Sequence, residues 1–124
     1  MSQYEFDRNL PIYIQIMDEI KKDIFSGKLK VGDKIPSVRE YAVQFGVNPN
    51  TIQKALTELE RAGLLRSERA VGRFVSDNQS AINAAQKQLC EDIVKNYVST
   101  MKAMGCNDEM IICMVRDFLK TERL

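Results

Sequence analysis

A short stretch of this 124-residue chain carries side-chain amides, a hydroxyl and an amine in close succession. Asparagine and glutamine can form paired hydrogen bonds with the edge of adenine, and threonine can bind a phosphate or touch the methyl group of thymine. These residue types favour hydrogen bonding to duplex DNA. The alternative is that the asparagines only cap a helix and make its first turn polar. The residues concerned are Asn48, Asn50, Thr51, Gln53 and Lys54.

A helix over about residues 47–62 would position these side chains. Asn48 is a preferred capping residue, Pro49 suits the first helical position, and Gly63 stands just beyond the last turn. Apolar residues recur at helical spacing, so the opposite face of the same helix is predicted to be buried. That apolar stripe consists of Ile52, Ala55, Leu56 and Leu59.

A second helix is predicted immediately upstream. Ser37 and Glu40 form the S-x-x-E pattern of a capping box, and Gly46 ends the helix. A turn of three or four residues that contains a glycine forces a steep crossing between two helices, which is typical of a helix-turn-helix. Further upstream, residues 11–27 predict a helix with isoleucine at every fourth position, and residues 28–34 favour a short strand.

Downstream of Gly63, residues 64–75 contain two short extended segments around a turn and predict a β-hairpin. Arg69 and Arg73 flank its tip. Residues 28–73 hold nine basic against five acidic residues, although the whole chain has a net charge of only +1. A basic hairpin behind a helix-turn-helix can contact the DNA backbone or minor groove, and the alternative is a solvated surface turn.

Several function classes find no support in the composition. The chain is 44% hydrophobic and 28% charged, as in ordinary globular proteins, and it contains no histidine, the commonest general base and metal ligand. No catalytic or phosphate-binding motif is present, so we expect no enzyme, no catalytic residue, no cofactor and no metal site. Three cysteines without metal-type spacing and no apolar run of about 20 residues favour reduced thiols, a cytoplasmic location and no membrane contact.

The run from Ile35 to Val75 is IPSVREYAVQFGVNPNTIQKALTELERAGLLRSERAVGRFV, and it resembles the winged helix-turn-helix of the GntR family of bacterial transcription regulators. The preceding PIYIQIMDEIKKDIFSGKLKVGDK is also similar, and VNPNTIQ with the short tail resembles the YtrA-like subgroup. The resemblance implies a dimeric repressor that binds operator DNA. We therefore expect a mainly α fold with a small β-hairpin, in which residues 1–78 form the DNA-binding domain.

The resemblance also assigns expected DNA contacts. The start of the second helix would bind phosphate or an adjacent base, residues 49–62 would form the recognition helix, and residues 66–75 would form the wing. The sequence departs from the family pattern where Gln53 replaces a common arginine, Ala70 a usual glycine and Arg73 a usual small residue. The expected DNA-binding residues are Ser37, Arg39, Asn48, Pro49, Asn50, Thr51, Gln53, Lys54, Arg69, Gly72 and Arg73.

Residues 79–124 predict two further helices, the first ending at Gly105 and the second capped by Asn107. Two helices cannot enclose a core of their own, so the same pair on a second copy is the natural partner, and the tail is expected to make a homodimer. The tail is too small for a full ligand-binding domain, so any effector, whose identity is unknown, would bind between subunits. The expected dimer contacts are Ile82, Leu89, Ile93, Tyr97, Met101, Ile111, Met114, Val115 and Phe118.

Three functions can be weighed from the residues, and the last of them, a small hydrolase, is supported only by scattered carboxylates. The first is a sequence-specific transcription regulator, expected to repress, that binds an inverted repeat in DNA as a homodimer. The second is a winged-helix module that docks on a partner protein and does not bind specific DNA, and the small local excess of positive charge is the best support for it.

Overall fold

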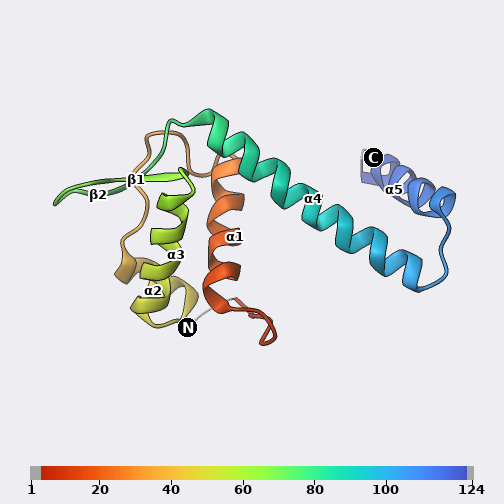
Figure 1. The fold of residues 1–124 in the computed structure, drawn as a ribbon, viewed down its shortest axis with the longest axis horizontal. Coiled ribbons are helices and arrows are strands. Elements are labelled where there is room, and N and C mark those ends of the chain that lie inside the picture. Colours follow the sequence, from red (N-terminus) through yellow and green to blue (C-terminus); the bar gives the residue numbers. More distant parts are fainter. Residues whose placement is uncertain (1–3, 123–124) are drawn as a thin grey trace. The chain divides into compact units, whose positions relative to one another are not determined.

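The computed structural model describes residues 4–122, which contain five helices and one antiparallel β-hairpin (Figure 1). This agrees with the expected mainly α fold. Internal contacts divide the chain into two compact units, Met1–Gln86 and Lys87–Leu124. In chain order the elements are α1 (Ile12–Phe25), α2 (Val38–Phe45), α3 (Pro49–Arg61), β1 (Leu65–Glu68), β2 (Gly72–Val75), α4 (Gln79–Ala103) and α5 (Asp108–Glu122).

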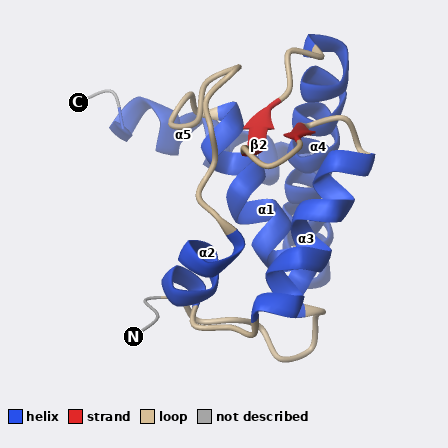
Figure 2. Ribbon diagram, turned by 90° about the vertical axis from the view of Figure 1, so that its left-hand side faces the viewer, coloured by secondary structure: helices blue, strands red, loops and turns tan. Residues whose placement is uncertain are grey.

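Helices α1 and α3 lie side by side in the first unit, and α2 packs across one end of α3 (Figures 1 and 2). In α1, Ile16, Ile20 and Ile24 are buried, because their four-residue spacing places them on one face of the helix. This face packs against the buried stripe of α3, formed by the four apolar residues that the sequence predicted.

The capping box of α2 is formed as predicted. The Ser37 hydroxyl accepts a hydrogen bond from the Glu40 amide at 3.1 Å, and a Glu40 carboxylate oxygen accepts one from the Ser37 amide at 3.0 Å. At the other end, Gly46 has a φ of 67°, in the left-handed region that glycine enters without steric cost. These two ends fix the short turn that leads into α3.

The N-terminus of α3 also follows the sequence prediction. The Asn48 side-chain oxygen accepts a hydrogen bond from the Asn50 amide at 2.8 Å, and Pro49 occupies the first helical position. Both features satisfy or remove amide groups that a helix start would otherwise leave without partners. The start of α3 is therefore stabilised by residues at the start of the helix itself.

The strand expected over residues 28–34 is wrong. Residues 30–33 form a turn, because the Asp33 amide donates to the Lys30 carbonyl at 2.9 Å and the Lys30 amide donates to the Asp33 carboxylate at 2.8 Å. Only Lys34 makes a β-bridge, to Phe74 of β2. The loop nevertheless supports the hairpin, since the Ile35 amide donates to the Arg73 carbonyl at 3.0 Å.

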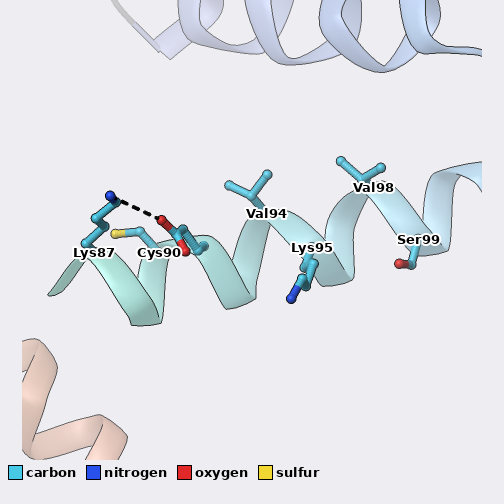
Figure 3. Close-up of a pocket in the computed structure, with 7 residues that line it drawn as sticks. Lys87, Cys90, Val94, Lys95, Val98 and Ser99 are labelled. Carbon is cyan, nitrogen blue, oxygen red and sulfur yellow. Dashed lines mark ion pairs between the residues drawn. The ribbon is translucent and has the colours of Figure 1, made fainter. Parts of the chain in front are cut away.

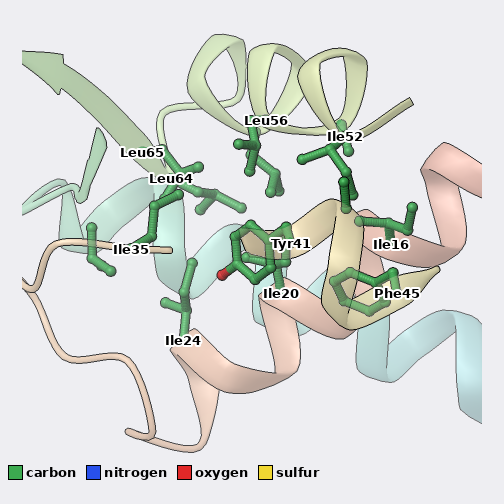
Figure 4. Close-up of a cluster of buried hydrophobic side chains, with 14 of the residues drawn as sticks. Ile16, Ile20, Ile24, Ile35, Tyr41, Phe45, Ile52, Leu56, Leu64 and Leu65 are labelled. Carbon is green, nitrogen blue, oxygen red and sulfur yellow. The ribbon is translucent and has the colours of Figure 1, made fainter. Parts of the chain in front are cut away.

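The core of the first unit lies among α1, α2, α3 and the base of the hairpin (Figure 4). Tyr41 and Phe45 of α2 sit between the isoleucines of α1 and the apolar face of α3. Ile82, in the first turn of α4, belongs to the same core and is only 6% exposed. The unit therefore runs past residue 78, the end of the DNA-binding domain expected from the sequence, to Gln86.

In the second unit, the C-terminal part of α4 meets α5. The Tyr97 hydroxyl donates to the Ile111 carbonyl at 3.0 Å, and Met101 and Ile111 are buried. Asn107 caps α5 as expected, since its side-chain oxygen accepts a hydrogen bond from the Met110 amide at 2.9 Å. The remaining apolar side chains of this unit are largely exposed.

Candidate nucleic-acid interface

The solvent-facing side of α3 carries the amide side chains identified from the sequence. Asn50 and Gln53 are exposed, whereas Ile52 and Ala55 between and beside them are fully buried. The Gln53 amide donates only one long hydrogen bond, 3.4 Å, to the Thr57 hydroxyl one turn further along. Both side-chain amides can therefore hydrogen-bond to a ligand without any change in the packing of the core.

The remaining expected residues of α3 are placed differently. The Asn48 side-chain oxygen is engaged in the cap, and Thr51 is half-buried. The Lys54 ammonium lies 4.1 Å from the centroid of the Tyr13 ring of α1, a cation–π contact that holds this side chain toward α1. Asn50 and Gln53 are thus the α3 side chains best placed for base contacts.

The start of α2 presents a cation beside its cap. Arg39 is exposed and has no ion-pair partner within residues 4–122. Ser37 lines a hollow of about 240 Å³ together with Gly72 and Arg73 of the hairpin. The fold therefore brings the start of α2 and the hairpin to one place, although 35 positions separate Ser37 from Gly72 in the sequence.

Hydrogen bonds from Ser37 lower the pKa of Glu40 below its ordinary value of 4.5, the backbone amide contributing most and the hydroxyl next. The downward shift shows that the hydrogen bonds of the cap favour the charged form of this carboxylate. These hydrogen bonds hold Ser37 in place at the start of α2, two positions before the exposed Arg39.

The three arginines of the hairpin have different surroundings. Arg66 pairs with Glu68 at 2.6 Å and lies over the Phe74 ring, 4.9 Å from its centroid. Arg73 pairs with Glu60 of α3 at 3.3 Å. Arg69, at the tip, is exposed and has no ion-pair partner in the described part of the chain, so it is the hairpin arginine available to a phosphate.

Two residues shape the tip of the hairpin. Ala70 has a φ of 65°, a left-handed conformation in which a side chain is strained. Gly72 has a φ of 139°, and a Cβ atom at this position would lie 2.9 Å from the Lys34 Cε atom. The Lys34 side chain is flexible and can move, so it is the positive φ that requires glycine at this position, independently of any contact with DNA.

Sequence reasoning missed two residues near the hairpin, Glu60 and Ser67. The Ser67 hydroxyl donates a hydrogen bond to the Glu60 carboxylate, which also accepts one from Arg73. The signal was present in the alternation of the strand, because Val75 is buried and Arg73, two positions earlier, must share its face. Counting charges placed Arg73 at the DNA surface, whereas the alternation points it toward α3.

The expected dimer contacts fall into separate groups. Ile82 lies in the core of the first unit, so its assignment to a dimer interface is wrong. Met101 and Ile111 are buried within their own chain, Tyr97 is hydrogen-bonded there, and Leu89 is half-buried. The exposed members of the set are Ile93, Met114, Val115 and Phe118.

Two negative findings concern the described residues. No group of three or more histidine, cysteine, aspartate or glutamate residues within 4–122 is arranged to hold a metal ion. Along the same stretch, none of the helices combines the length and the apolar character that crossing a bilayer requires.

Relatives by sequence are transcription regulators. The chain is 35% identical over 114 residues to the uncharacterized HTH-type regulator YhcF of Bacillus subtilis, covering 92% of this chain and 94% of that protein. It is 44% identical over 78 residues to the HTH-type transcriptional repressor YtrA of the same organism, covering 63% of this chain and 60% of YtrA. The match to YtrA agrees with the subgroup expected from the sequence.

Solved structures give the same result. A GntR family transcriptional regulator from Listeria monocytogenes superposes with a TM-score of 0.80 at 36% identity, covering 90% of this chain and 98% of that one. The AraR DNA-binding domain in complex with operator ORE1 superposes with a TM-score of 0.55 at 36% identity, covering 61% and 98%.

The family model of the bacterial regulatory proteins of the gntR family matches residues 12–75, more than half of the chain. This range contains α1, the helix-turn-helix and the hairpin. With its fold, its exposed amide-bearing helix and its relatives all in agreement, the chain belongs to the GntR family of DNA-binding transcription regulators.

Proposed function

We propose that this chain is a transcription repressor that binds an inverted-repeat operator as a homodimer, with α3 in the major groove and the hairpin against the backbone or minor groove. The observation that carries the proposal is the two-sided character of α3. Ile52 and Leu56 anchor one face in the core, while Asn50 and Gln53 stand in solvent on the other. A rigid helix with solvent-exposed amides is suited to hydrogen bonding with base edges.

The cations around α3 support the proposed docking. Arg39 at the start of α2 and Arg69 at the tip of the hairpin are both exposed and unpaired within residues 4–122. Phosphate contacts fix the orientation of a protein on DNA, and base contacts read its sequence. We assign Arg39 and Arg69 to the first role and Asn50 and Gln53 to the second.

Two relatives bear on the proposal. YtrA is named as a transcriptional repressor, and the AraR domain was solved in complex with operator DNA. Transfer of these properties to this chain is part of the proposal, since YtrA matches it over 63% of its length and the AraR domain over 61%.

The proposed homodimer is supported by apolar surface in the second unit. Val94 is 58% exposed and Phe118 is 64% exposed. Figure 3 shows Val94 and Val98 on one side of α4, where the helix lines a hollow of about 460 Å³. A second hollow of about 290 Å³ lies between Tyr97 and the apolar residues of α5. Exposed apolar side chains that are grouped in this way typically mark a protein interface.

A simple experiment can distinguish the proposed DNA-binding function from the alternative, a module that binds a partner protein. Electrophoretic mobility of a random-sequence duplex at low salt should shift with micromolar protein, because phosphate contacts give sequence-independent binding of about 10⁻⁴ to 10⁻⁶ M even at physiological salt. A duplex that does not shift would favour the protein-binding module.

The role of Arg39 can be tested in the same assay. Replacing Arg39 with Ala should weaken binding to all duplexes alike. It should also reduce the slope of log K against log salt by about 1.8, because the proposed homodimer loses one phosphate contact, worth about 0.9, in each subunit. A sequence-dependent loss with an unchanged slope would show that Arg39 reads a base.

A further inference from the structure

Glu60, near the end of α3, holds two side chains of the hairpin. Its Oε1 atom accepts a hydrogen bond from the Ser67 hydroxyl of β1 and another from Arg73 Nε of β2, the latter at 3.3 Å. Ser67 and Arg73 are opposite each other in the strand register. One carboxylate oxygen therefore bonds both strands of the hairpin to the helix.

The register explains why these side chains point toward α3. Leu65 pairs with Val75 and Ser67 with Arg73, so the four share one face of the hairpin. Leu65 is 3% exposed and Val75 is fully buried, which identifies this face as the inner one. Arg73 is accordingly half-buried, with 20% of its side chain exposed.

The hairpin depends on such attachments. It has only two strands, and an isolated two-stranded hairpin is marginally stable in water. Its base is held by the buried Leu65 and Val75, and Phe74 bridges to Lys34. Toward the tip, Ser67 and Arg73 are the last inward-facing residues before the turn at 69–71.

We propose that Glu60 is a positioning residue for DNA binding, which fixes the hairpin relative to α3 through Ser67 and Arg73, and that Arg73 acts through this link and not by contacting DNA. The inference rests on the proposed function, because it assumes that α3 and Arg69 engage one duplex together. A hairpin held at a fixed distance from α3 meets the backbone without a further ordering cost.

The two roles of Arg73 predict opposite effects of removing the Glu60 carboxylate. If Arg73 contacts phosphate, loss of Glu60 frees the guanidinium and removes a negative charge, so binding should tighten. If Glu60 positions the hairpin, the same change should weaken binding although it makes the surface more basic. Glu58 provides a matched control, since it is also on α3 and pairs with Arg61 at 2.7 Å.

The experiment measures binding of the full chain to a selected duplex by fluorescence anisotropy over a series of salt concentrations. Relative to Glu58→Ala, we expect Glu60→Ala to bind roughly fivefold more weakly, the size expected for losing a partly exposed ion pair that preorganises a contact. Arg73→Ala should show the same loss with an unchanged salt slope, and the double variant should be no weaker than either. Arg69→Ala should instead flatten the slope by about 1.8, because each subunit of the proposed homodimer loses one phosphate contact worth about 0.9.

Two results would overturn the inference: Glu60→Ala that binds as tightly as Glu58→Ala, or Arg73→Ala that flattens the salt slope as Arg69→Ala does. The exchange Glu60→Arg with Arg73→Glu should restore part of the lost affinity. Hydrogen exchange without DNA gives a second measurement, in which the amides of β1 and β2 should exchange faster in Glu60→Ala and Arg73→Ala than in Glu58→Ala. Unchanged exchange contradicts the link, whereas failure of the wild-type chain to bind any duplex contradicts only the proposed function.

Discussion

Individual residues differ in how far the sequence predicted their roles. Ser37 and Asn48 form the caps that their types and positions indicated, because capping depends only on residues nearby in the chain. Arg73 was expected to contact DNA because it is basic and lies near a hairpin tip. Its partner, Glu60, is 13 positions away, and local charge counting takes no account of the face on which a strand residue lies.

The burial of Tyr41 costs free energy in a way that the sequence does not reveal. Its side chain is in the core, and its hydroxyl has no hydrogen-bond partner within residues 4–122. Burial raises the pKa of this hydroxyl well above its ordinary value of 10.0. The ring fills the core while the oxygen is desolvated without compensation.

Replacing Tyr41 with Phe should therefore raise the free energy of unfolding by about 1 kcal/mol, because a buried donor without a partner is removed and the ring is kept. Urea denaturation followed by circular dichroism measures the change. Tyr97→Phe is the contrasting control, since its hydroxyl donates to the Ile111 carbonyl and its loss should be destabilising. A Tyr41→Phe chain that is less stable than wild type would mean that the hydroxyl has a partner.

Among the helices and strands, those with strong periodicity and marked ends were predicted well. Helices α2 and α3 have capping residues, glycines and apolar stripes that all agree, so their bounds lie close to the expected ones. The strand predicted over residues 28–34 is wrong because it depended on only two alternating apolar residues. The Asp33 carboxylate instead accepts a hydrogen bond from the Lys30 amide and closes a turn. The prediction that Ile82 lies in a dimer interface did not foresee that Ile82 packs into the core of the first unit. Helical periodicity shows which residues share a face but not which part of the protein covers that face.

The cap of α2 should be measurable in stability. Replacing Ser37 with Ala removes the hydroxyl that accepts the Glu40 amide and should lower the free energy of unfolding by about 1 kcal/mol at neutral pH. Ser99→Ala, at an exposed position on α4, is a control that should change little. An equal effect of both variants would show that the cap contributes nothing.

The same cap predicts a pH dependence. Because the pKa of Glu40 is lower in the folded chain than its ordinary value of 4.5, its contribution is complete above that pH. The contribution is lost as the pH falls through the folded-state pKa, where the carboxylate is protonated and the hydrogen bond from the Ser37 amide weakens. Glu40→Gln should remove this part of the acid dependence, and an unchanged profile would contradict the assignment.

At the scale of the whole molecule, a unit with a well-packed core is followed by a tail whose apolar residues are largely exposed. The sequence predicted the helices of the tail and their apolar content. It could not predict that the chain itself buries Met101 and Ile111, because helical periodicity shows which residues share a face but not what covers that face. The residues left exposed are the basis of the proposed homodimer.

Replacing Phe118 with Asp should dissociate the homodimer, since a charge at an apolar interface is costly to bury. Sedimentation velocity should show dimers for wild type and monomers for the variant, with helical content unchanged because Phe118 is 64% exposed within the chain. Leu10→Asp, at an apolar residue that is 53% exposed in the loop before α1, is the matched control and should remain dimeric. A wild-type chain that sediments as a monomer at all concentrations would remove the homodimer from the proposal.

Reading of DNA bases by the exposed face of α3 can be tested by selecting bound duplexes from a random pool, with the wild-type chain and Gln53→Ala in parallel. The wild-type chain should recover two inverted half-sites, about 10 base pairs apart from centre to centre, as expected for paired recognition helices. Gln53→Ala should lose preference at one base pair in each half-site, by about 1–3 kcal/mol of discrimination, and keep the rest of the motif. A pool without a shared motif, or an identical motif from both proteins, would contradict the assignment of α3 as the reading helix.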